Sequence, residues 1–403
     1  MKISIELDCP QCGAPVDLEE KDHMLSCPYC GVRRFLHFRN HPRLMLPAAC
    51  GKRSYSLLPY LRFKGAVYIC SASDISNRIV DITRLGVPCD DKLPLSLGMR
   101  PQAMKLKPVH PQMDGDFVRF SVRADVLLAR AGKVPGGNRG IFHRAFIGET
   151  LSVIYLPVYR EGDRLHDGVT GETLGKGIEL EDTVRNPVGF GLSLAAAVCP
   201  NCGWGLDGER SSVVLTCGNC SRAWETADGK LRQVRVEVWG KASERVLWLP
   251  FWRVDAVALG SGLETFDDFI RLTRQPAIDS ACLSDVPLSF CIPAFKIRPR
   301  IFLNLARQMT FAFRMAEPNP EFPAGLLYPV TLPRREAVQC RKLVLAECAV
   351  DRKRIFPLLP TLQFSGTEAV LAYVPFTDAG GELVDRNGHI GISRRALDLG
   401  YSL

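Results

Sequence analysis

The sequence contains Cys9-Pro-Gln-Cys12 followed, after fourteen residues, by Cys27-Pro-Tyr-Cys30. The same spacing returns in Cys199-Pro-Asn-Cys202 and Cys217-Gly-Asn-Cys220. Two residues between thiolates allow one tight turn to aim both sulfur atoms at a single ion, and a hairpin then brings the second turn around to complete a tetrahedron. The spacing predicts two zinc ribbons, each holding one structural Zn²⁺ through four cysteines. Iron uses the same kind of turn, so the sequence leaves the metal open.

The residue after the second cysteine of each turn supports this interpretation. It is glycine in three of the four turns (Gly13, Gly31 and Gly203) and serine in the fourth, at Ser221. Glycine adopts a left-handed backbone readily, and from that conformation amide hydrogens can point at the sulfur atoms. We expect Ser221 to adopt the same conformation at some energetic cost.

The string Cys27-Pro-Tyr-Cys30 also matches the dithiol of glutaredoxin-like redox enzymes. Such a dithiol must precede a helix, whose dipole lowers the pKa of the first thiol. Residues 31–42, which follow it, alternate in polarity and are basic, as is typical of a short strand and a loop. A redox enzyme also needs neither a second cysteine pair upstream nor a second copy of the arrangement, so metal binding is the favoured interpretation.

Length and composition describe an ordinary globular protein. The chain has 403 residues, enough for two or three domains, with 46% hydrophobic and 23% charged residues. No apolar stretch follows Lys2, and no window offers the 18 or more consecutive apolar residues of a spanning helix. We therefore expect a cytoplasmic protein with reduced thiols. The seven cysteines outside the quartets are expected to be small buried hydrophobic residues; they are Cys50, Cys70, Cys89, Cys282, Cys291, Cys340 and Cys348.

The two halves of the chain repeat each other beyond the cysteines. Leu58–Phe63 (LPYLRF) is echoed by Leu249–Val254 (LPFWRV), and residues 148–158 are echoed by residues 366–376. The segments combine alternating apolar residues with a proline, which is typical of strands at an edge or bulge of a sheet. The predicted fold is mainly β with minor α content and internally duplicated, each ribbon preceding a sandwich-like or barrel-like domain. The predicted units are zinc ribbon 1 (1–45), β-rich domain 1 (46–185), zinc ribbon 2 (195–235) and β-rich domain 2 (236–403).

A few helices and turns can also be predicted. Phe302, Leu305, Met309 and Phe313 recur at helical spacing after Pro299, and residues 123–131 and 335–349 are weaker helical candidates. Hairpin turns are predicted at Asp167-Gly168 and Asn387-Gly388.

The charge distribution raises the question of nucleic-acid binding. The formal net charge is +8, but eight ligating thiolates and two divalent ions together would halve it. A local basic and aromatic segment remains after the first ribbon. Basic side chains beside aromatic rings suit phosphate contact with base stacking, although solvated arginines around a small ribbon core explain the pattern more simply. The candidate nucleic-acid-binding residues are Arg33, Arg34, Arg39 and Arg43.

The cysteine turns with their following glycines resemble the rubredoxin-like, transcription-factor-IIB-type zinc ribbon superfamily. That resemblance covers the ribbons and implies no single function. A ribbon followed by Leu249-Pro250-Phe251-Trp252 also looks like uncharacterised bacterial proteins in which a ribbon precedes a β-rich domain, and this implies an interaction module.

No enzyme signature appears in its required context, whether P-loop, nucleophile elbow, HExxH or dinucleotide fingerprint. We expect a non-enzymatic adaptor or scaffold that binds a protein partner in a cytoplasmic assembly. Nucleic-acid binding is the alternative, and peripheral membrane association through the apolar strands is a third function. The identity of the partner and the oligomeric state stay open. The candidate partner-binding residues are Pro59, Tyr60, Pro250, Phe251 and Trp252.

Overall fold

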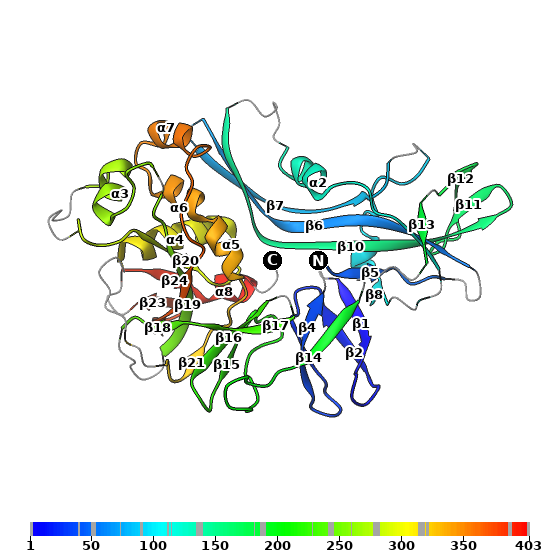
Figure 1. Ribbon diagram of the computed structural model, residues 1–403, viewed down its shortest axis with the longest axis horizontal. Helices are drawn as coiled ribbons and strands as arrows, with labels where there is room; N and C mark the ends of the chain where they lie inside the picture. Colours follow the sequence, from blue (N-terminus) through cyan, green and yellow to red (C-terminus); the bar gives the residue numbers. More distant parts are fainter. Residues whose placement is uncertain are drawn as a thin grey trace.

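The computed structural model confirms a mainly β protein, with 44% strand and 17% helix. It describes residues 3–38, 41–49, 54–72, 74–88, 92–110, 113, 115–133, 140–180, 182–185, 191–227, 229–240, 246–258, 260–276, 283–312, 319, 322–385 and 389–400. In Figure 1 the long strands of the first half run along the top, the second half lies on the left, and the two ribbons lie side by side below them.

The first half is built around three long antiparallel strands. β6 (Ser56–Ser71) pairs with β10 (Ile141–Glu161) on one side and with β7 (Asp74–Leu85) on the other. Shorter strands complete an eleven-stranded sheet. They are β1 (Ser4–Asp8), β2 (Pro15–Glu19), β5 (Arg43–Met45), β8 (Lys105–Pro108), β9 (Asp116–Val118), β11 (Arg164–Asp167), β12 (Thr173–Lys176) and β13 (Thr183–Val184). Two short helices accompany them, α1 (Arg100–Ala103) and α2 (Ala124–Ala131).

The second half has a seven-stranded sheet and most of the helices. Its strands are β18 (Val236–Val238), β19 (Val246–Asp255), β20 (Ser289–Pro293), β21 (Leu326–Leu327), β22 (Ala369–Asp378), β23 (Glu382–Asp385) and β24 (Gly391–Ser393). Its helices are α3 (Phe266–Thr273), α4 (Pro299–Ala312), α5 (Arg334–Gln339), α6 (Arg341–Cys348), α7 (Arg352–Ile355), the 3₁₀ helix η2 (Phe356–Leu358) and α8 (Arg394–Gly400).

The two sheets share one topology, which fits two repeated units. In the first half the order is β5-β10-β6-β9, with the outer strands parallel to their neighbours and the central pair antiparallel. In the second half β18-β22-β19-β21 has the same order and the same directions. The registers correspond as well, because Leu57 faces Pro157 as Trp248 faces Pro375.

The repeated prolines lie inside central strands, and the pairing explains how they are tolerated. Pro59 falls between the part of β6 that pairs with β9 and the part that pairs with β7, and Pro250 falls likewise between the β21 and β20 partners of β19. No neighbour requires an amide hydrogen at that point, so the missing proline donor costs nothing there. The expectation of an edge or bulge is corrected, because each proline marks a change of partner strand inside the sheet.

The ribbons carry two further small sheets. In ribbon 1, β3 (Met24–Ser26) and β4 (Arg33–Phe38) are joined by β14 (Leu192–Ala196). In ribbon 2, β15 (Val214–Cys217), β16 (Arg222–Ala227) and β17 (Lys230–Val234) form a meander. β14 therefore crosses the boundary predicted at residue 195, and the segment between the halves completes the sheet of ribbon 1.

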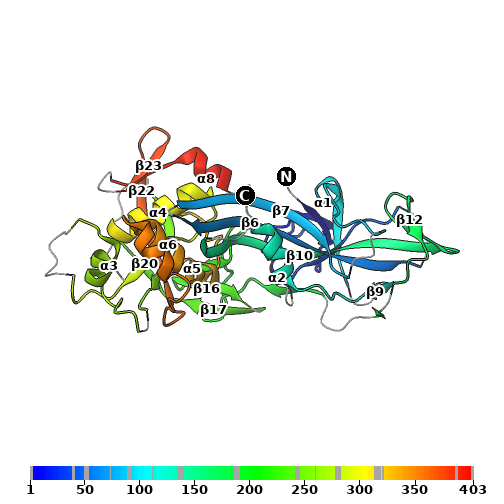
Figure 2. The ribbon, with the colours of Figure 1, turned by 90° about the horizontal axis from the view of Figure 1, so that it is seen from above.

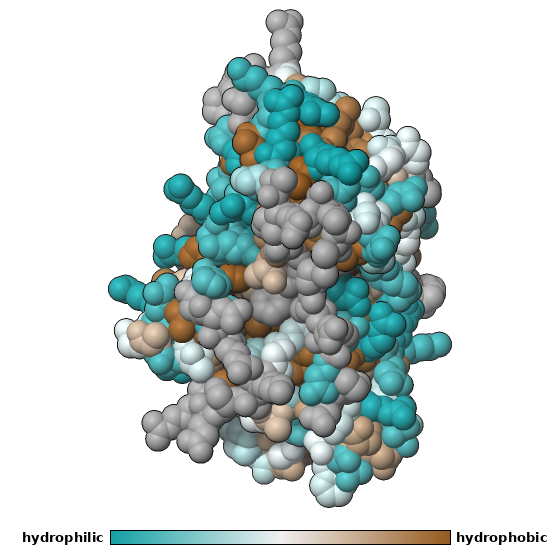
Figure 3. Space-filling view, turned by 90° about the vertical axis from the view of Figure 1, so that its left-hand side faces the viewer, coloured by the Kyte–Doolittle hydropathy of each residue, from teal (hydrophilic) through white to brown (hydrophobic). Residues whose placement is uncertain are grey.

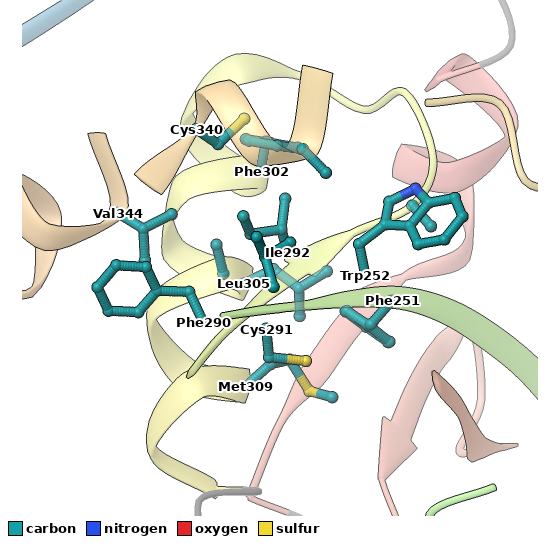
Figure 4. Close-up of a cluster of buried hydrophobic side chains, with 14 of the residues drawn as sticks. Phe251, Trp252, Phe290, Cys291, Ile292, Phe302, Leu305, Met309, Cys340 and Val344 are labelled. Atoms are coloured by element: carbon teal, nitrogen blue, oxygen red, sulfur yellow. The ribbon is translucent and has the colours of Figure 1, made fainter. Parts of the chain in front are cut away.

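The predicted helices are present where the structure describes them. Residues 302–312 lie in α4, residues 335–348 form α5 and α6, and residues 124–131 form α2. The chain reverses after Asp167 as predicted, with the Asp167 carboxylate accepting the Val169 amide. Phe313 and the predicted turn at Asn387-Gly388 lie outside the described residues. α4 packs its apolar face on β19 and β20 in the large core of the second half (Figure 4), where Phe302, Leu305 and Met309 are buried.

The far ends of β6, β7 and β10 reach the second half, as Figure 2 shows from above. The Tyr68 hydroxyl donates to the Pro299 carbonyl over 3.3 Å, and the Tyr68 and Phe302 rings pack together. Arg352 pairs with Asp74 over 3.3 Å. Tyr68 and Ile147 belong to the same apolar cluster as the α4 residues, so this core spans both halves.

A buried ion group joins ribbon 1 to the long strands. Arg62 of β6 has no exposed surface and donates to both carboxylate oxygens of Asp81 on β7, over 3.0 and 2.9 Å, and to Glu20, which follows β2. Its counterpart Arg253 donates to Glu237 but keeps 27% of its side chain exposed. The first copy thus holds its ribbon through a buried charge.

We predict that Arg62→Ala destabilises the protein by about 3–5 kcal/mol, because two carboxylates would lose their buried partner. Arg253→Ala, the matched substitution in the second half, should cost about 1 kcal/mol, because its ion pair is partly solvated. Urea unfolding followed by circular dichroism measures both. Equal losses for the two variants would contradict the buried role of Arg62.

Candidate metal centres

The four cysteines of ribbon 1 meet at one point. Their sulfur atoms all lie within 4.8 Å of one another, with 3.7 Å from Cys9 Sγ to Cys30 Sγ and 3.7 Å from Cys12 Sγ to Cys27 Sγ. Four sulfurs at about 2.3 Å from a central ion are separated by about 3.8 Å in a tetrahedron, whereas a disulfide requires about 2.05 Å. The distances fit a metal ion and exclude a disulfide among these four cysteines.

Ribbon 2 forms an equivalent centre. Its four sulfur atoms meet the same 4.8 Å limit, with 3.6 Å from Cys199 to Cys220 and 3.5 Å from Cys202 to Cys217. In both ribbons the first cysteine of each turn is buried, and the second is at least partly exposed. Each four-cysteine centre therefore lies near the surface, with two of its cysteines buried and the other two at least partly exposed.

All four turns share the predicted backbone. The residue after each second cysteine has a positive φ, from 71° to 74° for Gly13, Gly31 and Gly203, and 53° for Ser221. In each turn that residue donates its amide to the carbonyl of the first cysteine, as from Ser221 to Cys217 over 2.9 Å. The serine thus adopts a conformation that costs an L-residue about 1 kcal/mol or more.

The thiol pKa values in ribbon 2 indicate a need for a cation. Hydrogen bonds from the Asn219 side chain and then the Trp204 amide lower the pKa of Cys202 to about 6. Burial and the neighbouring thiols of Cys217 and Cys199 raise the pKa of Cys220 to about 12. Sulfurs this close cannot all be thiolates without a positive ion between them. A bound metal ion would remove that repulsion, so the donor set fits a cationic metal.

The two ribbons also contact each other directly. Arg33 of β4 donates to the Asp207 carboxylate and the Gly208 carbonyl of ribbon 2, each over 3.0 Å. In the other direction Arg210 pairs with Asp22 over 2.9 Å, and its carbonyl accepts the His23 and Met24 amides. Met24 shares a small apolar cluster with the ribbon 2 ligands Cys199 and Cys217. The ribbons therefore form one module.

Two of the four candidate nucleic-acid-binding arginines form hydrogen bonds within the fold. Arg33 joins the ribbons, Arg34 is half-buried in β4, and Arg43 donates to the Tyr155 hydroxyl over 2.8 Å. Arg39 lies outside the described residues. The basic segment seen in the sequence thus contributes to contacts within the fold.

The candidate partner-binding residues lie in the core. Tyr60, Phe251 and Trp252 have no exposed surface, and the Trp252 indole donates to the Leu332 carbonyl over 2.9 Å. Pro59 and Pro250 are buried in the same strands. A side chain without exposed surface cannot offer a contact to a partner or to a bilayer, so we correct their assignment to a core role.

The structure describes four of the seven remaining cysteines. Cys70, Cys291, Cys340 and Cys348 are all buried, and burial is the main cause that raises the pKa of each thiol. They pack as small hydrophobic residues, as predicted; Cys50, Cys89 and Cys282 lie outside the described residues. Sequence reasoning missed the exposed aromatic residues on the ribbons: Tyr29 is 71% and Trp204 is 61% exposed. Their places within or beside the cysteine turns were the available signal.

No family model, curated protein or solved structure matches this chain. In the described part of the chain, none of the helices has the length and apolar character needed to span a bilayer.

We predict that Cys27→Ser lowers the metal content from two ions per chain to one, because a hydroxyl is a poor substitute for one of four thiolates. Most of the circular dichroism of the β-rich domains should remain, because the apolar clusters around α4 and around Phe63 contain none of the eight quartet cysteines. Inductively coupled plasma mass spectrometry of the purified protein measures the metal.

The control for this variant is Cys340→Ser, which changes a buried cysteine outside the quartets. Its Sγ donates to the Glu336 carbonyl over 3.2 Å, a bond that serine can keep. Two ions should remain bound. Metal content unchanged by Cys27→Ser would contradict the assigned ligands.

We predict that Ser221→Gly and Gly203→Ser, which exchange the residues after the second cysteine of each turn in ribbon 2, change its metal affinity in opposite directions. Ser221→Gly should tighten metal binding about fivefold, because it removes about 1 kcal/mol of left-handed strain. Gly203→Ser should weaken it by a similar factor, since a Cβ at Gly203 meets no atom within 4 Å and adds only backbone strain. Competition with a chromogenic zinc chelator measures both affinities, and changes of the same sign would refute the turn geometry.

Proposed function

We propose that this protein is a non-enzymatic zinc-ribbon adaptor that binds a protein partner through its paired ribbons. The proposal rests chiefly on one observation: Tyr29 and Trp204 are exposed on turns whose backbone is fixed by a four-cysteine centre. Tyrosine and tryptophan supply large contact areas with little conformational entropy, and they dominate binding energy at protein interfaces.

Zinc is the metal we assign to both centres. Four thiolates in tetrahedral arrangement suit Zn²⁺, and four protein ligands leave no open position for a substrate or a water molecule. Such a centre acts through stability: structural zinc contributes about 10–16 kcal/mol of apparent binding energy in small ribbons. Colourless protein containing two equivalents of zinc supports this assignment, and iron in the protein as purified from its native cell would overturn it.

The contacts between the ribbons make the module suitable for docking. Each ribbon contributes one arginine that pairs with an aspartate of the other ribbon, in the pairs Arg33–Asp207 and Arg210–Asp22. The apolar cluster around Met24 adds further contact between the ribbons. A preorganised surface binds with a smaller entropic cost than a mobile one. The left-hand side of the molecule in Figure 1 faces the viewer in Figure 3, where the described residues show separate apolar areas among hydrophilic ones.

Quantitative affinity purification from the native cell tests this function. We compare the tagged wild-type chain with a Tyr29→Ala and Trp204→Ala double variant, which leaves all eight cysteines in place. Proteins that bind the ribbons should be depleted at least about tenfold by the double variant, as expected for the loss of one or two interface anchors.

The matched control is Val350→Ala, which changes another exposed apolar side chain, 63% exposed and preceding α7. It should capture the same proteins as the wild type, and all three chains should contain two metal ions. A capture pattern identical in the wild type and the double variant would refute the role of the ribbons.

A further inference from the structure

A groove of about 550 Å³ separates ribbon 2 from the sheet of the second half. One wall is the edge strand β15 with the second cysteine turn, and the other is the segment 322–330 with Tyr373 of β22. Val214, Leu327 and Val330 give it an apolar lining. The groove therefore lies directly beside the second metal centre.

The two ribbons differ in their connection to the large sheets, because strands β1 and β2 of ribbon 1 belong to the main sheet of their half, whereas β15-β16-β17 of ribbon 2 form a separate sheet. In the first half β8 pairs with both β1 of ribbon 1 and β5 of the domain. By the sequence repeat, residues 105–108 correspond to residues 296–299, which form no strand and lead into α4. Ribbon 2 is consequently not hydrogen-bonded into the sheet of its own domain through such a strand.

A tyrosine hydroxyl is available at the groove. Tyr373 is only 2% exposed, lines the groove, and has no hydrogen bond from its hydroxyl within the described part of the chain. In the first half, the corresponding tyrosine is Tyr155, whose hydroxyl accepts a hydrogen bond from Arg43. In the second half, the position of Arg43 is occupied by Val236, which has no side-chain donor. The second copy thus keeps the tyrosine and loses its partner. Because the groove is open at this tyrosine, the hydroxyl can form a hydrogen bond with a ligand.

The edge of β15 offers a backbone site at the same place. The amide of Val213 donates to the Val330 carbonyl, and Thr216 exchanges two hydrogen bonds with Asp207. Between them, strand alternation directs the amide and carbonyl of Val214 away from β16 and toward the groove. An extended polypeptide can pair with such an edge, as in recognition by strand addition.

The charge of the rim selects the kind of peptide. Asp207 and Glu209 are exposed at the groove, and its described lining contains no lysine, arginine or histidine. Asp207 already pairs with Arg33, whereas Glu209 has no ion pair within the described residues. The groove therefore combines an apolar wall, an available tyrosine hydroxyl and a negative rim.

We propose that this groove binds an extended peptide segment of a protein partner that carries a lysine or arginine side chain. The peptide backbone pairs with Val214, one of its carbonyl groups accepts the Tyr373 hydroxyl proton, and its cation pairs with Glu209. This deepens the adaptor function proposed above and depends on it for the partner, but it uses a surface distinct from Tyr29 and Trp204.

Selection from a random peptide phage library on the immobilised, zinc-loaded full chain tests the groove. Selected peptides should be enriched in lysine or arginine. Their affinity, measured by isothermal titration calorimetry, should fall about 3- to 10-fold in Tyr373→Phe and in Glu209→Gln, as expected for the loss of one hydrogen bond or one solvated ion pair. The Glu209→Gln loss should shrink at high salt.

Tyr155→Phe is the matched control, because it removes the corresponding hydroxyl from the first half and should leave peptide affinity unchanged. No enrichment, enrichment of acidic peptides, or affinity independent of Tyr373 and Glu209 would overturn the groove proposal. A different result would overturn only the role of Tyr29 and Trp204: peptides bind the groove as expected, but the double variant captures the same partners as the wild type. The two proposals can therefore fail separately.

Discussion

The convergence of four cysteine sulfur atoms at one point, in a geometry suited to a metal ion, is the constraint on which the rest of this structure depends. The buried cysteines of the quartets are themselves part of the apolar cores. Cys9 and Cys27 belong to the cluster that ribbon 1 shares with the first domain, and Cys199 and Cys217 belong to the small cluster between the ribbons. Fixing the sulfur atoms therefore also fixes the packing around them. The contacts between the ribbons, such as Arg33 with Asp207, depend on that local order.

The duplicated architecture shows how one topology supports two different environments. Both copies place a proline where the partner strand changes and a tyrosine opposite it, since Pro59 faces Tyr155 and Pro250 faces Tyr373. The copies differ in what surrounds this framework. In the first, β8 and the Arg62 ion group attach the ribbon to the sheet; in the second, the ribbon packs against its domain without a shared strand, and a groove remains.

The sequence predicts the local features well, and physical reasons explain where it does not. The cysteine turns, α4 and the repeated strands depend on short-range spacing, and all were identified correctly. The partners of Arg33 and Arg43 lie 174 and 112 residues away in the sequence, so contacts of this basic segment could not be predicted from short-range spacing. Pro250, Phe251 and Trp252 suggested an edge strand because a proline cannot donate, but a change of partner strand satisfies the same requirement inside a sheet.

The metal and the groove are physically connected in ribbon 2. Cys217 and Ser221, which form one coordinating turn, also line the groove, and Thr216 beside them holds Asp207 at its rim. Loss of the ion would release this wall together with the turn. If a ligand binds only the ordered groove, the metal ion must raise the affinity for the ligand. By linkage, the ligand must then raise the affinity for the metal ion by the same factor. A metal ion bound by these four cysteines would then control the proposed binding at the groove through the wall that it holds in place, although it has no open coordination position.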